Sequence, residues 1–305
     1  MTTEAVRETE AVPAVTVAGG VRGLAMDYVR LTKPRVISLL LVTTAAAMFV
    51  AAGGPPGHWL LVWTLVGGYL AAGGANAINH FIDRDIDGRM ARTSTRPVVS
   101  GRVTPVRALA FGVGLGALSA VVLTLAANAL AAVLALAGLA VYVGVYSLWL
   151  KRTSVHNIVI GGAAGAVPPL VGWAAVTGEL SLYAWILFAV VFYWTPPHFW
   201  ALALLLERDY RAAGVPMLPV VHGPAVTRMQ VLLWSLVMTG VTLLPVAAGL
   251  AGALYGAAAL ALGAVFVWCA WRLVREGTRR WARITFHWSL LYLALVFVAM
   301  ALDAA

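Results

Sequence analysis

The sequence predicts an all-α protein, built as a polytopic membrane bundle of nine transmembrane helices. Three observations support this fold class. The chain of 305 residues is 62% hydrophobic and only 11% charged, whereas soluble domains are about half apolar and about a quarter charged. Its apolar residues form runs close to the ~20 residues that a helix needs to cross a bilayer. All 21 lysines and arginines lie before the first run or in every second connection between runs.

The nine apolar runs give the expected helices. They cover residues 36–53, 59–80, 104–126, 129–149, 155–176, 181–206, 227–249, 252–274 and 283–302. Pro34 and Pro105 stand where proline is favoured in the first turn of a helix, and Thr104 is the expected N-cap of the third run. Short connections, such as the glycine- and proline-rich residues 53–57, favour antiparallel neighbours and therefore an up-and-down bundle.

The basic residues predict how the bundle is oriented. With nine spans, every connection that carries them lies on one side, and the positive-inside rule assigns that side to the cytoplasm. We therefore expect a multi-pass protein of the cell (inner or plasma) membrane, with its N-terminus and active-site loops in the cytoplasm and its C-terminus outside. The opposite connections carry only Glu179 and, at the end of the chain, Asp303. Because topology explains the net charge of +9, no nucleic-acid partner is expected.

The two ends of the predicted domain follow from composition. Residues 1–21 are expected to be a disordered tail, because Glu4, Glu8 and Glu10 occupy the place where a signal peptide carries positive charge. Residues 22–305 are expected to form one nine-helix transmembrane domain. The single cysteine, Cys269, has no partner for an internal disulfide and is interpreted as a buried apolar residue.

The strongest functional signal is an acidic stripe at the end of the second span. Asn79, Asp83 and Asp87 are four residues apart, so on a helix they share one face. Asp85 is about 200° from Asp83 and faces elsewhere. Carboxylate and amide oxygens suit Mg²⁺, which proteins usually hold together with substrate phosphates. The competing interpretation is a solvated helix end with local Asp–Arg pairs, but charged groups in a membrane helix are costly and usually functional.

Basic residues surround this stripe in the sequence. Arg92, Arg96 and their neighbours follow it directly, and Lys151 and Arg152 end the fourth span. Arginine forks match phosphate oxygens, so carboxylates for a metal beside arginines for phosphate suit a diphosphate leaving group. The alternative role of each basic residue is to fix topology or to anchor a helix end at the membrane interface.

The sixth span carries a second set of polar residues. Thr195 and Pro196 predict a cap and a first helical turn, hence a break within that span. If the helix is otherwise unbroken, Asp209 lies within about 20° of the face of His198, whereas Glu207 lies about 180° away. Asp209 is therefore preferred to Glu207 as a site carboxylate.

These motifs resemble a known family. The segment Asn79-x-x-x-Asp83-x-x-x-Asp87 resembles the first aspartate-rich motif of the UbiA superfamily of intramembrane prenyltransferases. Further segments are similar to the haem-farnesylating branch of that superfamily: residues 146–157, 161–169, 194–200 (Trp-Thr-Pro-Pro-His-Phe-Trp) and 209–219 (Asp-Tyr to Pro-Met-Leu-Pro). The resemblance runs from about Asp27 to the last span. The chain departs from many superfamily members in lacking a second Asp-x-x-x-Asp motif, which leaves open whether one or two magnesium ions are held.

The resemblance implies a UbiA-like bundle with its active site at the cytoplasmic side. It implies the transfer of the farnesyl group of farnesyl diphosphate to a vinyl group of haem B, which gives haem O in haem A/O biosynthesis for terminal oxidases. Mg²⁺ is the implied cofactor, and farnesyl diphosphate and haem B are the implied substrates. Membrane lipid and a downstream haem A synthase are the implied partners.

The resemblance also implies roles for individual residues. Magnesium is assigned to Asn79, Asp83, Asp87 and Asp209, which with Lys151 form the catalytic set. Arg92 and Arg96 are assigned to the diphosphate. Lys151 and Arg152 are assigned to the diphosphate or to a haem propionate. Tyr146 and Trp200 are expected to stabilise an allylic cation through their ring faces, and Asn157 to contact substrate. His198 is expected either to contact haem, as an iron ligand or beside a propionate, or simply to bond within the bundle. His80 and His156 are weaker candidates for the same role.

Three other functions remain open from the sequence. Another UbiA-type enzyme with a quinone-precursor acceptor is the nearest, although the Pro-Pro-His-Phe-Trp segment argues against it. A divalent-cation transporter also uses acids in the membrane, but it places them near the bilayer midplane. A non-catalytic haem-handling assembly factor is the third, and its function would survive loss of Asp83.

Overall fold

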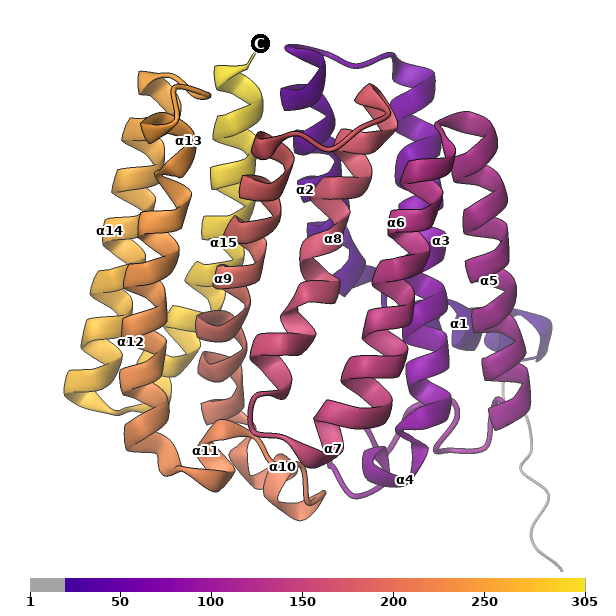
Figure 1. Ribbon diagram of the computed structural model, residues 1–305. Coiled ribbons are helices and arrows are strands. Elements are labelled where there is room, and N and C mark those ends of the chain that lie inside the picture. Colours follow the sequence, from indigo (N-terminus) through magenta and orange to yellow (C-terminus); the bar gives the residue numbers. More distant parts are fainter. Residues whose placement is uncertain (1–19, 305) are drawn as a thin grey trace, which may run out of the picture.

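The computed structural model describes residues 20–304, and these residues contain helices but no strands. Nine of the helical segments in this part of the chain are long and apolar enough to span a membrane, which confirms the prediction, with ends within about one turn of those expected. The segments are α2 (Pro34–Ala52), α3 (His58–Ile82), α5 (Pro105–Ala126), α6 (Ala129–Ala140) with η1 (Val141–Leu150) and α7 (Lys151–Thr153), α8 (Asn157–Thr177), α9 (Leu182–Leu205), α12 (Gly223–Thr242) with α13 (Leu244–Ala247), α14 (Ala253–Glu276) and α15 (Arg279–Asp303). They stand side by side as a bundle (Figure 1).

The expected helix starts are confirmed at two places. Thr104 is the N-cap of α5, and its side-chain oxygen accepts a hydrogen bond from the Arg107 backbone N–H at 3.4 Å. Pro34 and Pro105 occupy the first turns of α2 and α5, where the N–H that proline lacks has no partner within the helix.

A helix that precedes the first span was not anticipated. The segment α1 (Gly20–Thr32) lies crosswise to the long helices in Figure 1. It is amphipathic and short, so a search for long apolar runs passes over it. Its buried Asp27 pairs with Arg30 at 3.1 Å and with Arg102 at 2.9 Å, which ties α1 to the segment before α5. The predicted tail lies mostly outside the described residues, and its last two residues, Gly20 and Val21, begin α1.

The predicted break in the sixth span is wrong. The helix α9 continues through Pro196 and Pro197, and Thr195 is not a cap. The Thr195 hydroxyl instead donates to the Val191 carbonyl at 2.9 Å, one turn earlier in the same helix. Membrane helices tolerate proline because hydroxyl groups and neighbouring helices satisfy the freed backbone groups.

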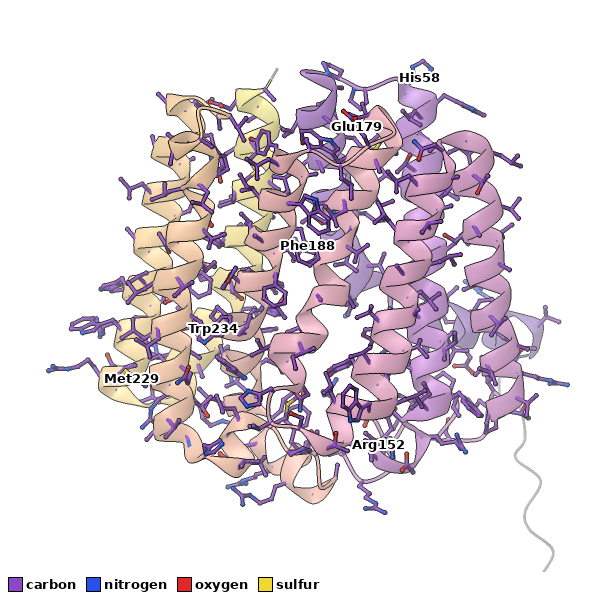
Figure 2. All side chains as sticks on the ribbon, viewed as in Figure 1. His58, Arg152, Glu179, Phe188, Met229 and Trp234 are labelled. Carbon is purple, nitrogen blue, oxygen red and sulfur yellow. The ribbon has the colours of Figure 1, made fainter. Side chains whose placement is uncertain are left out.

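Four short helices lie together at one end of the bundle. The segments α4 (Arg84–Asp87), α7, α10 (Glu207–Ala212) and α11 (Leu218–Val221) all lie at that end in Figure 1. Figure 2 shows Arg152 at this end, whereas His58 and Glu179 lie at the opposite end. The connections that carry the basic residues are therefore together, as the one-sided charge pattern predicted.

The bundle has an apolar interior and an apolar outer surface. Its largest buried cluster joins α2, α8, α9, α12, α14 and α15, and it contains Tyr255, Tyr292, Phe266 and Phe297. Large apolar side chains such as Val121, Leu260 and Leu291 are also exposed on the outside of the long helices. Soluble proteins rarely expose so much apolar surface, so this outer surface suits hydrocarbon.

Glycines allow the helices near the centre of the bundle to approach closely. A Cβ atom built on Gly172 in α8 would lie 2.3 Å from the Thr44 carbonyl oxygen of α2, and one built on Gly74 in α3 would lie 2.6 Å from the Gly112 carbonyl oxygen of α5. Backbone atoms cannot move aside as side chains can, so these contacts require glycine.

We expect the substitution Gly172→Ala to lower the free energy of unfolding by about 1–3 kcal/mol, the usual effect of overpacking. Gly165→Ala is the matched control, because it lies in the same helix and its added Cβ meets nothing within 4 Å. Thermal unfolding in detergent measures both. Equal melting temperatures for the two variants would contradict the close α2–α8 contact.

Candidate active site

The acidic stripe is buried where α3 ends. Asp83 follows the last residue of α3 and Asp87 ends α4, and the exposed fractions of Asn79, Asp83 and Asp87 are 3%, 0% and 1%. The Asn79 side-chain amide donates to Asp83 Oδ2 at 2.6 Å. This burial excludes a solvated helix end. A carboxylate in an apolar interior also requires strong compensation by cations or hydrogen bonds.

Basic groups from distant segments compensate the two carboxylates. Lys151, at the end of the fourth span, donates from Nζ to Asp83 Oδ2. Arg96 donates from Nη1 to Asp87 Oδ2 at 2.5 Å. The other oxygen of each carboxylate, Oδ1, is enclosed and has no hydrogen-bond partner. A buried oxygen without a donor is a place for a cation.

A residue that the sequence analysis assigned to topology contacts the stripe as well. Lys33, between α1 and α2, donates from Nζ to Asn79 Oδ1 at 3.1 Å. Its φ of 56° lies in the left-handed region, which costs a non-glycine residue roughly 1–2 kcal/mol. Burial, together with the charges of Arg96 and Lys151, lowers the pKa of Lys33 to about 7.

The signal for Lys33 was present in the composition. The chain uses arginine for almost every basic residue, and its only two lysines are Lys33 and Lys151. Both contact the stripe. A compact ammonium at the end of a flexible stem fits a narrow buried space that a planar guanidinium does not.

The segment that carries Lys151 has an unusual backbone. The fourth span changes from α-helix to π-helix in η1, directly before Lys151. Ser147 in η1 accepts a hydrogen bond from the Asn79 side-chain amide at 3.1 Å. π-Helical segments are rare in proteins, and those that occur are often found at functional sites. The apolar pattern of residues 141–150 is equally compatible with an α-helix, so this π-helix could not be predicted from it.

Asp85 and Arg152 form a pair outside the stripe. Two hydrogen bonds of 2.7 Å join the Arg152 guanidinium to the Asp85 carboxylate, and a third, of 2.8 Å, reaches the Ile82 carbonyl. The Asp85 side chain is 53% exposed whereas that of Asp83 is fully buried, as expected for two side chains on different faces. Hydrogen bonding from Arg152 lowers the pKa of Asp85 to about 2. Arg152 is thus engaged by protein groups, with its nearest approach to Asp83 at 3.9 Å.

A cavity of about 580 Å³ opens beside the stripe. Its lining is mostly cationic and comprises Arg30, Lys33, His80, Arg92, Thr95, Arg96, Pro97 and Arg102. Both ring nitrogens of His80 are enclosed and unpartnered. Arg92 has no ion-pair partner within residues 20–304. The arrangement suits a ligand with several negative charges, and it includes the predicted Arg92 and Arg96.

The structure does not bring Asp209 to the stripe. Asp209 lines a different cavity, of about 330 Å³, with Arg208 and Arg279. The geometric reason for preferring it fails, because α9 ends at Leu205 and α10 begins a separate helix. Glu207 is paired with Arg211 at 2.7 Å. Among the described residues, no group of three His, Cys, Asp or Glu side chains is placed to hold a metal.

Three other predicted residues differ in how they are buried and bonded. Tyr146 packs in one cluster with Ile86 and Met90, which flank Asp87. Asn157 is fully buried at the start of α8, where its Nδ2 donates to the Ser154 carbonyl at 2.8 Å and its Oδ1 has no partner. His156 is exposed.

Trp200 is placed away from the stripe. It packs in a cluster with Leu218, Val231 and Cys269, and its ring meets Trp234 edge to face at 5.8 Å. This cluster contains none of the stripe residues. The role of Trp200 in stabilising an allylic cation stays a prediction. Cys269 is buried, as expected.

His198 is buried between α9 and α15. Its Nδ1 lies 2.6 Å from the Ser289 hydroxyl oxygen, and its ring stacks on Trp194 and on Phe286, with centroid distances of 4.2 and 4.9 Å. The bonding within the bundle that the sequence analysis considered is thus present for Nδ1.

The fold is that of a membrane-embedded prenyltransferase. The UbiA prenyltransferase family model matches residues 40–300, so the chain belongs to this family and is a multi-pass membrane protein. It resembles a protein from an Archaeoglobus fulgidus structure, a UbiA homologue bound to GPP and Mg²⁺, with a TM-score of 0.65 and 17% identity over 90% of this chain and 99% of that chain. A structure of digeranylgeranylglyceryl phosphate synthase gives a TM-score of 0.75 at 18% identity, over 92% and 98% of the two chains. These likenesses confirm the UbiA fold.

The names of the sequence relatives are more specific than the family. The chain is 57% identical to a protoheme IX farnesyltransferase of Symbiobacterium thermophilum, over 91% of this chain and 93% of that protein. It is 56% identical to one of Thermus thermophilus and 54% identical to one of Chloroflexus aurantiacus, over 92% of this chain in both cases. It spans about half the length of these last two relatives, 46% and 48%.

The Asp85–Arg152 pair predicts a pH dependence. The pKa of Asp85 is lower in the folded chain than in the unfolded chain, so the pair stabilises the fold above the ordinary carboxyl pKa near 4 and loses this contribution as the pH falls toward 2. Because Asp85 is largely exposed, we expect the contribution to be at most about 1 kcal/mol. The difference in melting temperature between wild type and Asp85→Asn should therefore shrink as the pH falls from 5 to 2. A constant difference would contradict this role.

Proposed function

We propose that this protein transfers the farnesyl group of farnesyl diphosphate to a vinyl group of haem B, which gives haem O. One observation carries the proposal: two buried carboxylates, each with an unpartnered oxygen, lie beside a cavity lined by cations. This arrangement suits a metal-bound diphosphate. The sequence relatives named protoheme IX farnesyltransferase support haem B as the acceptor.

The stripe suits Mg²⁺ as a cofactor. The unpartnered Oδ1 atoms of Asp83 and Asp87 and the amide oxygen of Asn79 are hard oxygen donors, and Mg²⁺ is commonly held by one or two carboxylates together with substrate phosphates. Two carboxylates without a third are consistent with that mode. When bound, the ion supplies charge stabilisation to the departing diphosphate. We do not assign Asp209 to this ion, because it lines a separate cavity.

The cationic residues have complementary tasks. Lys33, Lys151 and Arg96 donate hydrogen bonds to the stripe in the described structure. Each of these side chains carries further N–H donors that would serve a phosphate oxygen of the substrate. Arg92, which lines the cavity, is available to the diphosphate directly. Fixed cations in a buried site stabilise the negative charge that develops as the leaving group departs.

The proposed reaction begins with cleavage of the bond between C1 of the farnesyl group and the diphosphate oxygen, and the diphosphate keeps the electron pair. The vinyl group of haem B attacks the allylic cation and forms a carbon–carbon bond. Water then adds to the resulting cation and loses a proton, which gives the hydroxyl group of haem O. We assign the stabilisation of the allylic cation to the aromatic ring of Tyr146; its packing in the cluster of Ile86 and Met90 supports this assignment.

We also propose that the end of the bundle that carries Arg152 faces the cytoplasm, on the basis of the basic residues in its connections. The C-terminus then lies outside. The diphosphate enters from the aqueous side, while the farnesyl chain lies among the apolar helices. The protein belongs on this view to the cell membrane, and a haem A synthase is the natural next user of haem O.

The proposal is tested by assaying the purified full-length protein with haem B and farnesyl diphosphate. We expect haem O to form with Mg²⁺, to fall below detection with EDTA, and to return when Mg²⁺ is added in excess, because the diphosphate cannot leave without charge neutralisation. Chromatography with mass detection identifies the product. Turnover of a phenolic acceptor without haem O would favour a quinone-precursor enzyme, and metal flux in vesicles without prenyl transfer would favour a transporter.

The matched pair Asp83→Asn and Asp85→Asn tests the role of the stripe. Asp83 is buried with one unpartnered oxygen, whereas Asp85 is exposed and paired with Arg152. We expect Asp83→Asn to lower kcat by at least about 10²-fold, as loss of a preorganised electrostatic group does. Asp85→Asn should keep kcat within about threefold, in line with an exposed ion pair. Retained kcat in Asp83→Asn would contradict the proposed metal-binding role of the stripe.

A further inference from the structure

The imidazole of His198 is held in one orientation by its neighbours. Trp194, one turn earlier in α9, stacks on it at an interplanar angle of 17°, and Phe286 of α15 stacks at 27°. Phe199 meets the ring edge to face at 5.1 Å. The ring is thus enclosed by aromatic side chains, and its two nitrogens are the groups left to interact with anything polar.

Ser289 determines which nitrogen carries the proton. Its hydroxyl donates to the Phe286 carbonyl oxygen at 2.6 Å, and the same hydroxyl oxygen lies 2.6 Å from His198 Nδ1. A hydroxyl has one proton. With that proton on the Phe286 carbonyl, the Nδ1–H of His198 must be the donor and the Ser289 oxygen the acceptor. Nε2 then carries a lone pair and no proton.

Ser289 is itself fixed in place. The indole Nε1–H of Trp194 donates to the Ser289 backbone carbonyl at 2.7 Å. One residue of α15 therefore receives hydrogen bonds from two residues of α9, Trp194 and His198, that lie one turn apart. The contact holds the imidazole relative to α15 as well as to its own helix.

The lone pair on Nε2 is unused. Nε2 forms no hydrogen bond within residues 20–304, and it is not among the enclosed polar atoms without partners, unlike both ring nitrogens of His80. It therefore retains some access. His198 also lies one turn closer than Trp194 to the end of α9 that leads into α10, and Trp194 belongs to the main apolar cluster.

We infer that His198 binds the iron of haem B through Nε2 and that Ser289 is a positioning residue that imposes this tautomer. The inference rests on the proposed function, which makes haem B the acceptor. A ring with the proton on Nδ1 offers Nε2 as a metal ligand, and ligating histidines usually donate their other N–H to a fixed oxygen. A haem propionate needs a donor, which Nε2 lacks, so the geometry favours the iron. Iron ligation orients the porphyrin and hence its vinyl group.

The test uses the full-length protein in detergent with ferric haem B and no farnesyl diphosphate. We expect the wild type to show the absorption and electron paramagnetic resonance signature of imidazole ligation. His198→Gly should lose it, and added imidazole should restore it. His287→Gly is the matched control, because His287 lies in α15 but is exposed and bonded to the Arg283 carbonyl. Its haem spectrum should match that of the wild type.

The Ser289 variants separate positioning from folding. Ser289→Ala should weaken haem affinity about tenfold, as loss of an outer-shell partner does, and should lower the iron–histidine stretching frequency in the ferrous state. Ser289→Thr, which keeps a hydroxyl, should restore both. Size-exclusion chromatography and circular dichroism identify any variant that fails to fold, and the Ala–Thr comparison decides the matter if His198→Gly is unstable.

The outcomes distinguish the two proposals. A wild-type haem spectrum in His198→Gly, or no spectral change in Ser289→Ala, overturns this inference while haem O formation by the wild type still supports the proposed function. If the wild type neither binds haem B nor forms haem O, both proposals are overturned.

Discussion

The structure depends on two carboxylates buried just beyond the end of the membrane-spanning helix α3. Removing a carboxylate from water costs several kcal/mol unless cations and hydrogen bonds replace the lost hydration. Asp83 and Asp87 are compensated by Lys151 and Arg96 and by the Asn79 amide. These partners come from three different segments, so the compensation also fixes how those segments pack around α3 and α4.

The rest of the bundle makes this convergence possible. Close approach at Gly74 and Gly172 brings α5 toward α3 and α8 toward α2. Ser147 in the π-helical η1 and Lys151, which follows η1, both contact the stripe. Lys33, which lies between α1 and α2 in a left-handed conformation, donates from its ammonium to Asn79. Each feature has a local cost and is retained because several polar contacts depend on it.

The sequence predicted the spans and the stripe well, and the remoter partners less well. Asn79, Asp83 and Asp87 were found because they share one helix face within nine residues. The geometric reason for choosing Asp209 failed because it assumed a helix continuing past Leu205, where α9 ends. Lys33 and Ser289 were missed because each acts across a long sequence separation, 46 residues to Asn79 and 91 residues to His198.

By itself, then, the sequence determined the membrane-spanning helices and their number within residues 20–304, the end of the bundle where charge gathers, and the acidic stripe. These follow from hydrophobicity and helical periodicity, which act over a few turns of one segment. Only the tertiary structure decided which basic groups neutralise the stripe, which face α9 turns to α15, and which nitrogen of His198 is protonated. Those outcomes depend on contacts between helices that are distant in the chain, and no local pattern encodes them.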